Sequence, residues 1–278
     1  MPNSARPAID QYAVIGHPIA HSKSPFLHSV FASQTGQSMQ YLALLAPLDQ
    51  FEATVRQFIQ DGGRGANVTL PFKIEAYDLC DELTPRAQAA GAVNTLSFLD
   101  NQIRGDNTDG CGLVRDITSN ANLDLRGKRI LLIGAGGAAR GAVLPLLECH
   151  PTELTIANRS NEKAHQLANE FRQYGKINTS KFAALAAGYD VIINATSSSI
   201  EGQRPDIPDA AFKVETLAYD MMYASHPTAF MEHARQLHAH PRDGWGMLIE
   251  QAAEAFFVWR GIRPDTSTLL VKENWEAH

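Results

Sequence analysis

Short apolar runs alternate with longer amphipathic stretches along the first part of the chain. Three short runs each predict a strand, and these are YAVIG (12–16), MQYLALLA (39–46) and GANVTL (65–70). The segments 24–36 and 48–63 have apolar residues at helical spacing, and each ends in glycine. Ser24 is the expected N-cap of the first helix, with Pro25 at its first position, and an aspartate is expected to cap the second. Strand–helix–strand order predicts parallel strands with right-handed crossovers.

The alternation is interrupted by a loop-rich stretch at 101–127 and then restarts. Beyond it, strands are expected at 128–134, 153–158, 190–196 and 216–221, and helices at 138–149, 161–173 and 245–260. We therefore expect an α/β protein of two domains with a boundary near residue 110. The domains would be 1–110, completed by 244–278, and 111–243, with the last helix packing back on the first domain.

Composition narrows the class of protein. The 278 residues are 44% hydrophobic and 19% charged, which is enough apolar material for packed cores. A net charge of −6 disfavours a nucleic-acid-binding protein. Cys80, Cys111 and Cys149 are widely spaced, as expected for reduced thiols. The start MPNSARPAID has no apolar signal region, and no run approaches the ~18 apolar residues of a membrane span. A cytoplasmic protein with no membrane partner is expected.

A glycine-rich turn at 134–139, GAGGAA, follows one apolar strand and opens a helix. It fits G-x-G-x-x-G/A, in which glycine permits a tight turn and lets the backbone approach a pyrophosphate at the helix N-terminus. The motif alone is weak, because other α/β proteins have similar turns.

The loop after the next strand reads NRSNEK, with Arg159 and Lys163 but no acidic residue directly after the strand. A carboxylate there would bind the ribose 2′-hydroxyl of NAD, whereas cations attract the 2′-phosphate of NADP. The loop therefore favours NADP, and the alternative is a solvated basic loop. The ten histidines form no H-E-x-x-H, and no metal site is expected.

Four polar stretches in the first domain are candidates for chemistry. NVTLPFK (67–73) reads as a strand that proline stops just before Lys73. GHPIAHSKSP (16–25) offers serine hydroxyls and backbone N–H groups at a helix N-terminus, which suit a carboxylate. AGAVNTL places Asn94 in an apolar strand, and GDNTDG places Asp109 beside a glycine. Each has an ordinary alternative as a solvated charge, a cap, a strand end or a turn.

Taken together, these motifs resemble the shikimate dehydrogenase family. The resemblance runs in order through GHPIAHSKSPFLHS, NVTLPFK, AGAVNTL, GDNTDG, GAGGAAR, NRS, INATSSS, YDMMY and GMLIEQAAEAF. It implies a substrate domain, a Rossmann NADP domain and an active site between them. The implied reaction is reversible reduction of 3-dehydroshikimate to shikimate with NADPH, in chorismate and aromatic amino-acid biosynthesis. A monomer or homodimer is expected.

The resemblance also implies roles for individual residues. The substrate carboxylate would be held by Ser22, Ser24 and Tyr223, and the ring hydroxyls by Thr69, Asn94 and Gln251. Lys73 and Asp109 match the catalytic pair. The pyrophosphate would lie on Gly134, Ala135, Gly136, Gly137 and Ala138, and the adenosine phosphate on Asn158, Arg159, Ser160 and Lys163. Met221 and Gly244 would line the nicotinamide.

Three positions depart from the family pattern. Ser199 replaces a usual glycine, Trp245 a smaller residue, and Lys163 a frequent arginine. Lysine keeps the charge but loses the planar fork, so the preference for NADP could be softer. The alternatives are a dehydrogenase that also uses quinate or NAD, a non-catalytic sensor, and a folate-type dehydrogenase.

The chemistry of ketone reduction explains why a lysine would be aimed at the substrate. Hydride addition generates alkoxide character on oxygen, which needs a proton or a cation, and an ammonium supplies both. An unperturbed lysine pKa of ~10.4 makes the neutral amine scarce for the reverse reaction, so burial would have to lower it. Asp109 would orient the lysine. The sequence leaves open which of the two moves the proton.

Overall fold

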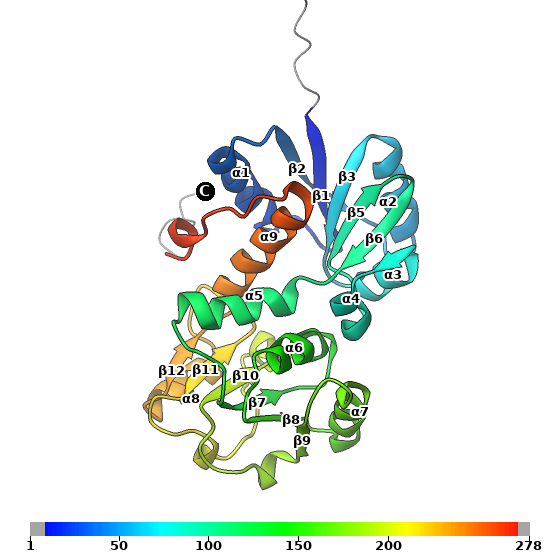
Figure 1. Ribbon diagram of the computed structural model, residues 1–278. Coiled ribbons are helices and arrows are strands. Elements are labelled where there is room, and N and C mark those ends of the chain that lie inside the picture. The colour runs from blue at the N-terminus through cyan, green and yellow to red at the C-terminus, as the bar shows by residue number, and fades with distance from the viewer. Residues whose placement is uncertain (1–8, 272–278) are drawn as a thin grey trace, which may run out of the picture. The chain divides into compact units, whose positions relative to one another are not determined.

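The computed structural model describes residues 9–271, which form two compact units. The first unit contains the described residues up to Thr108 and from Gln251 onward, and the second is Asp109–Glu250. Figure 1 shows the two α/β units, each built around its own sheet. Among residues 9–271, no helix combines the length and apolarity needed to cross a membrane.

The first unit contains a six-stranded sheet in the order β2-β1-β3-β5-β6-β4. Its strands are β1 (Asp10–Gly16), β2 (Met39–Leu45), β3 (Gly63–Val68), β4 (Glu82–Leu83), β5 (Thr95–Leu99) and β6 (Gln102–Asp106). The parallel pairing predicted for the first three strands is confirmed, because β1 pairs parallel with both β2 and β3. β5 then runs antiparallel to β3, and β6 antiparallel to β5.

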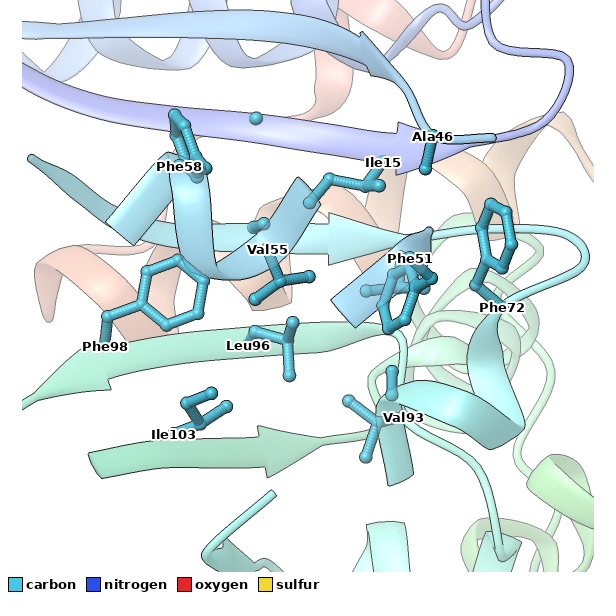
Figure 2. Packing of buried hydrophobic residues seen from close by; sticks show 14 of the residues in the cluster. Ile15, Ala46, Phe51, Val55, Phe58, Phe72, Val93, Leu96, Phe98 and Ile103 are labelled. Carbon is cyan, nitrogen blue, oxygen red and sulfur yellow. The ribbon is translucent and has the colours of Figure 1, made fainter. Parts of the chain in front are cut away.

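Helices cover both faces of this sheet. They are α1 (Ser24–Thr35), α2 (Phe51–Gln60), α3 (Lys73–Leu79), α4 (Pro85–Ala90) and the part of α9 (Trp245–Arg260) from Gln251 onward. Side chains alternate along β1, so Ala13 and Ile15 join the core beneath α2. Tyr12 points to the other face, where its ring lies 4.7 Å from that of Trp259 in α9. Figure 2 shows the α2 side of the core, where Phe51 stacks against Phe72 with ring centroids 4.9 Å apart.

The second unit has a fully parallel sheet in the order β12-β11-β10-β7-β8-β9. Its strands are β7 (Arg129–Ile133), β8 (Glu153–Ala157), β9 (Ile177–Ser180), β10 (Val191–Asn194), β11 (Leu217–Asp220) and β12 (His240–Arg242). Its helices are α5 (Asp109–Arg115), a π-helix (Asp116–Asn120), α6 (Gly137–Glu148), α7 (Asn161–Phe171), α8 (Ala229–Gln236) and the start of α9. Chain order reverses between β7 and β10, which gives a Rossmann-type switch point.

Short 3₁₀ helices complete the described elements. They are Phe182–Ala184, Ser198–Glu201, Asp209–Ala211 and Ser267–Leu269.

Several predicted boundaries are wrong by a few residues. Ser24 is the first residue of α1 rather than its cap, and Lys23 occupies the N-cap position. α2 begins only at Phe51, after Gln50 rather than an aspartate cap. β3 starts and ends two residues before the predicted 65–70 strand, since it spans Gly63–Val68. Caps are set by local hydrogen bonds that the apolar spacing does not specify.

Helix α5 lies within the stretch predicted to be loop-rich. Glycines at positions 110 and 112 lower its intrinsic helix propensity. Gly110 allows a close helix contact instead, because a Cβ atom there would lie 2.3 Å from the backbone oxygen of Gly141 in α6. Tertiary packing therefore overrides the local signal.

Candidate active site

The polar residues of the first unit gather at one edge of its sheet. The chain leaves β1 toward Ser22 and Ser24, and it leaves β3 toward Thr69. Because β5 runs antiparallel to β3, its start lies at the same edge, and Asn94 immediately precedes it. The fold thus places four of the predicted substrate residues at the carboxyl ends of the parallel strands.

The two serines and the threonine are held by local contacts. Ser24 is buried, and its backbone N–H donates to Ser22 Oγ at 3.3 Å. The backbone N–H of Thr69 donates to the carbonyl of Ile15 at 3.0 Å. Gly16 makes room for this threonine, because a Cβ atom at Gly16 would lie 2.4 Å from Thr69 Cγ2.

Lys73 emerges from a fixed backbone position, as NVTLPFK predicted. It is the first residue of α3, directly after the fully buried Phe72. Its backbone carbonyl accepts a hydrogen bond from the N–H of Val93 at 2.9 Å. The lysine side chain itself is half-buried. The backbone is thus anchored on both sides, which limits where the amine can point.

Asn94 lies in a buried network of side-chain hydrogen bonds. It is 2% exposed, and its Oδ1 accepts from the Thr108 N–H at 2.8 Å. Its Nδ2 donates to Thr108 Oγ1 at 3.0 Å and to Gln251 Oε1 at 3.2 Å. Two residues with predicted substrate roles, Asn94 and Gln251, are therefore in direct contact.

A buried ion-pair cluster supports the chain just before Thr108. Arg86 makes two 2.6 Å hydrogen bonds to Asp106, and its Nη1 lies 2.9 Å from Glu254. Burial alone would raise the pKa of Asp106, but the hydrogen bonds and charge of Arg86, with hydrogen bonds from Thr84 and Asn107, hold it below its usual value. This cluster was not predicted from the sequence.

Replacing Arg86 with methionine should lower the free energy of unfolding by about 3–5 kcal/mol at neutral pH, since Asp106 would be buried without its cation. In the parent protein the pKa of Asp106 is depressed. Its stabilisation is therefore complete above about pH 4 and is lost as the pH falls through the folded pKa. In the variant the unpaired carboxyl has a raised pKa, so stability should fall as pH rises toward neutrality.

Urea unfolding at several pH values measures this change. Arg56→Met is the matched control, because Arg56 forms an exposed pair with Glu52 on α2 and should contribute less than about 1 kcal/mol. An Arg86→Met protein as stable as the control at every pH would contradict the role given to the cluster.

In the second unit, the glycine loop lies at the switch point. Gly134 has φ 115°, a left-handed value, and a Cβ atom there would lie 3.2 Å from the backbone oxygen of Ala195 after β10. At Gly136 and Gly137, which open α6, a Cβ atom would meet nothing within 4 Å. The loop thus offers open space at a helix N-terminus, which fits a bound pyrophosphate.

The basic loop after β8 carries two exposed cations. Asn158 Nδ2 donates to the carbonyl of Ser160 at 3.0 Å, and Ser160 occupies the N-cap position of α7. Arg159 and Lys163 are exposed, and within residues 9–271 neither forms an ion pair. Arg140, by contrast, pairs with Glu170. Two cations therefore remain for an anion such as a 2′-phosphate.

Met221 and Gly244 are brought together after β11. The N–H of Gly244 donates to the carbonyl of Met222 at 3.0 Å, and a Cβ atom at Gly244 would lie 2.2 Å from the Met221 backbone oxygen. The loop is anchored by the fully buried Asp220, which accepts from Ser199 Oγ at 2.6 Å. The serine that departs from the family pattern thus has a structural partner.

Tyr223 lies in the same loop and is 37% exposed. Trp245, another departure from the family pattern, packs edge-on against it with ring centroids 5.8 Å apart. Burial raises the pKa of Tyr223, so its hydroxyl stays protonated at neutral pH and can donate a hydrogen bond.

Replacing Gly244 with alanine should push the Met221 backbone away. We expect the free energy of unfolding to fall by about 1–3 kcal/mol and the KM for NADPH to rise. Steady-state kinetics with a thermal unfolding curve checks both effects. An unchanged KM for NADPH would argue that this loop does not border the nicotinamide.

The predicted residues thus form two sets, one in each unit. Lys73 belongs to the first unit, whereas Asp109 begins the second, so their pairing stays a prediction. Asn67, Thr108 and Asp220 were given no role from the sequence, although Asn67 lies within an apolar run and Asp220 directly follows one. Among residues 9–271, no group of three or more His, Cys, Asp or Glu side chains could hold a metal ion.

Three family models match the chain in order. The shikimate dehydrogenase substrate-binding domain matches residues 14–96, and shikimate/quinate 5-dehydrogenase matches residues 115–202. The shikimate 5′-dehydrogenase C-terminal domain matches residues 244–269. The matches therefore extend over both units.

Individual relatives agree with these models over nearly the full length. The shikimate dehydrogenase (NADP(+)) of Herminiimonas arsenicoxydans is 55% identical over 95% of this chain and 96% of its own. A crystal structure of an Ael1 enzyme from Pseudomonas putida is 46% identical with a TM-score of 0.90, covering 94% of this chain and 97% of that one. Shikimate 5-dehydrogenase from Thermus thermophilus, solved with NADP(H) and shikimate, is 31% identical with a TM-score of 0.83, covering 93% and 96%. The prediction made from the ordered motifs is confirmed: this chain belongs to the shikimate dehydrogenase family of oxidoreductases.

Proposed function

We propose that this protein is an NADP-dependent shikimate dehydrogenase, which reduces 3-dehydroshikimate to shikimate reversibly in the biosynthesis of chorismate and the aromatic amino acids. One observation carries the proposal. The half-buried Lys73, at the start of α3, lies at the same edge of the sheet as the buried Ser24 and Asn94. The chain that carries these residues is 55% identical to a shikimate dehydrogenase (NADP(+)).

The substrate is bound mainly by the first unit. Ser22 and Ser24 donate hydrogen bonds to its carboxylate, and Tyr223 adds its protonated hydroxyl. Thr69, Asn94 and Gln251 bind the ring hydroxyls. The network around Asn94 supports this role, because it holds the Asn94 and Gln251 amides in direct contact.

Lys73 and Asp109 are the catalytic pair. NADPH, when bound, would supply the hydride and leave as NADP⁺. Lys73 donates a proton to the oxygen that becomes the new hydroxyl, and its charge stabilises the developing alkoxide. Asp109 accepts a hydrogen bond and orients the reacting groups. In the reverse reaction the neutral amine of Lys73 takes the hydroxyl proton.

The second unit binds the cofactor. The backbone of Gly134, Ala135, Gly136, Gly137 and Ala138, at the start of α6, would hold the pyrophosphate. Asn158, Arg159, Ser160 and Lys163 bind the 2′-phosphate end, and Met221 and Gly244 border the nicotinamide. The assignment of substrate binding to residues 1–110 with 244–278, and of cofactor binding to 111–243, follows from these roles.

Direct spectrophotometric assays with two cofactors and two substrates test the function. NADPH should be oxidised rapidly with 3-dehydroshikimate and far more slowly when NADH replaces it. Quinate with NADP⁺ is the second substrate to test, because one matching family model is described as shikimate/quinate 5-dehydrogenase. Absence of NADPH oxidation with 3-dehydroshikimate would refute the proposal. A cytoplasmic location stays a prediction. The oligomeric state, a monomer or a homodimer, also stays a prediction, and light scattering tests it.

A further inference from the structure

Asn67 in β3 is a buried amide whose orientation is fixed by its partners. It is 6% exposed, and its Nδ2 donates to the backbone carbonyl of Asn94 and to Thr95 Oγ1, both at 3.1 Å. A backbone carbonyl can only accept, so the donor end of Asn67 must face Asn94. Its Oδ1 therefore faces Tyr41, whose hydroxyl donates to it at 2.7 Å.

The orientation of the Asn94 side chain follows from the same logic. The Thr108 N–H can only donate, and it lies 2.8 Å from Asn94 Oδ1. The Thr95 hydroxyl, which accepts from Asn67, also donates to this oxygen at 2.9 Å. Because Asn94 Oδ1 accepts from Thr108 and Thr95, the NH₂ group of Asn94 faces Gln251. Each residue thus sets the direction of the next hydrogen bond.

Tyr41 is held at the start of this chain by an aromatic stack. Its ring lies 4.1 Å from that of His28 in α1, with an angle of 5° between the planes. His28 is fully buried, and neither ring nitrogen has a hydrogen-bond partner among residues 9–271. Burial lowers the pKa of His28 to about 3, so the ring is neutral and packs as an aromatic surface.

The Tyr41 hydroxyl stays protonated. Burial raises the pKa of Tyr41 well above its usual value. The hydroxyl therefore remains a hydrogen-bond donor across the physiological range, and it donates to Asn67.

We propose that Tyr41 and Asn67 are positioning residues for the amide subsite. The chain Tyr41–Asn67–Thr95–Asn94 fixes which end of the Asn94 amide is offered to the substrate. The inference rests on the proposed role of Asn94 in binding a ring hydroxyl.

The sharpest test removes one hydroxyl. Tyr41→Phe keeps the stacked ring but no longer donates to Asn67, so the KM for shikimate should rise by about 2- to 13-fold. The KM for NADP⁺ should stay unchanged. Tyr77→Phe is the matched control, because Tyr77 packs against the core of the same unit. It should leave both KM values unchanged.

A double-mutant cycle separates positioning from general loss of structure. If Tyr41 acts through Asn94, Tyr41→Phe should have no further effect on the KM for shikimate in an Asn94→Ala protein. Additive effects, or an unchanged KM in Tyr41→Phe alone, would overturn the inference. If Asn94→Ala itself left the KM for shikimate unchanged, the proposed substrate site would be the part refuted. The two failures are therefore distinguishable.

Discussion

Replacement of Lys73 by alanine is expected to lower kcat by about a hundred- to ten-thousand-fold, the usual contribution of a positioned acid or base. The lysine starts α3 on a backbone held by Phe72 and Val93, so truncating its side chain should leave the fold intact. The glycine loop and the NRSNEK loop lie in the other unit, so NADPH binding should change little. Steady-state kinetics and a fluorescence titration of NADPH measure the two effects.

Lys176→Ala is the matched control for the loss of one positive charge, because Lys176 is exposed before β9 in the second unit. It should retain full turnover. If Lys73→Ala lost NADPH affinity and turnover to the same extent, Lys73 would be a cofactor or folding residue, and the proposed proton transfer would be wrong.

Replacement of Arg159 by aspartate is expected to weaken NADPH about 10- to 100-fold more than NADH. Arg159 is exposed beside Ser160, and within the described residues it has no ion-pair partner. The substitution removes a charge-assisted hydrogen bond and places a carboxylate near the 2′-phosphate, whereas NADH has only a hydroxyl there. The ratio of the two kcat/KM values measures the effect.

Arg126→Asp provides the same change of charge on an exposed loop elsewhere in the second unit. Its NADPH to NADH ratio should match that of the parent protein. If the ratio were also unchanged in Arg159→Asp, the NRSNEK loop would not bind the 2′-phosphate.

Much of the fold could be predicted because its signals are local. The apolar runs gave β1, β2, β7 and β8 within two residues, and helical spacing gave α9 from Trp245 to Arg260 as observed. Helix α5 was missed because Gly110 and Gly112 lower its local helix propensity, while Gly110 allows a close contact with α6. β12 was not predicted, since its three residues are a strand only through pairing with β11.

The candidate site also divides into residues with a local sequence signal and residues whose role depends on distant contacts. Lys73 and the glycine loop were found because each follows an apolar strand directly. Tyr41 and Asp106 were not found, since their importance comes from hydrogen bonds to residues 20 or more positions away. Such contacts depend on strand register and on the return of α9 to the first unit, neither of which the local pattern of residues specifies.

A crystal structure with shikimate and NADP⁺ bound tests the central claim most directly. We expect the Lys73 Nζ atom within about 2.6–3.2 Å of the substrate hydroxyl that loses hydrogen to the nicotinamide. An ammonium directed into solvent, with another side chain at that hydroxyl, would contradict the account.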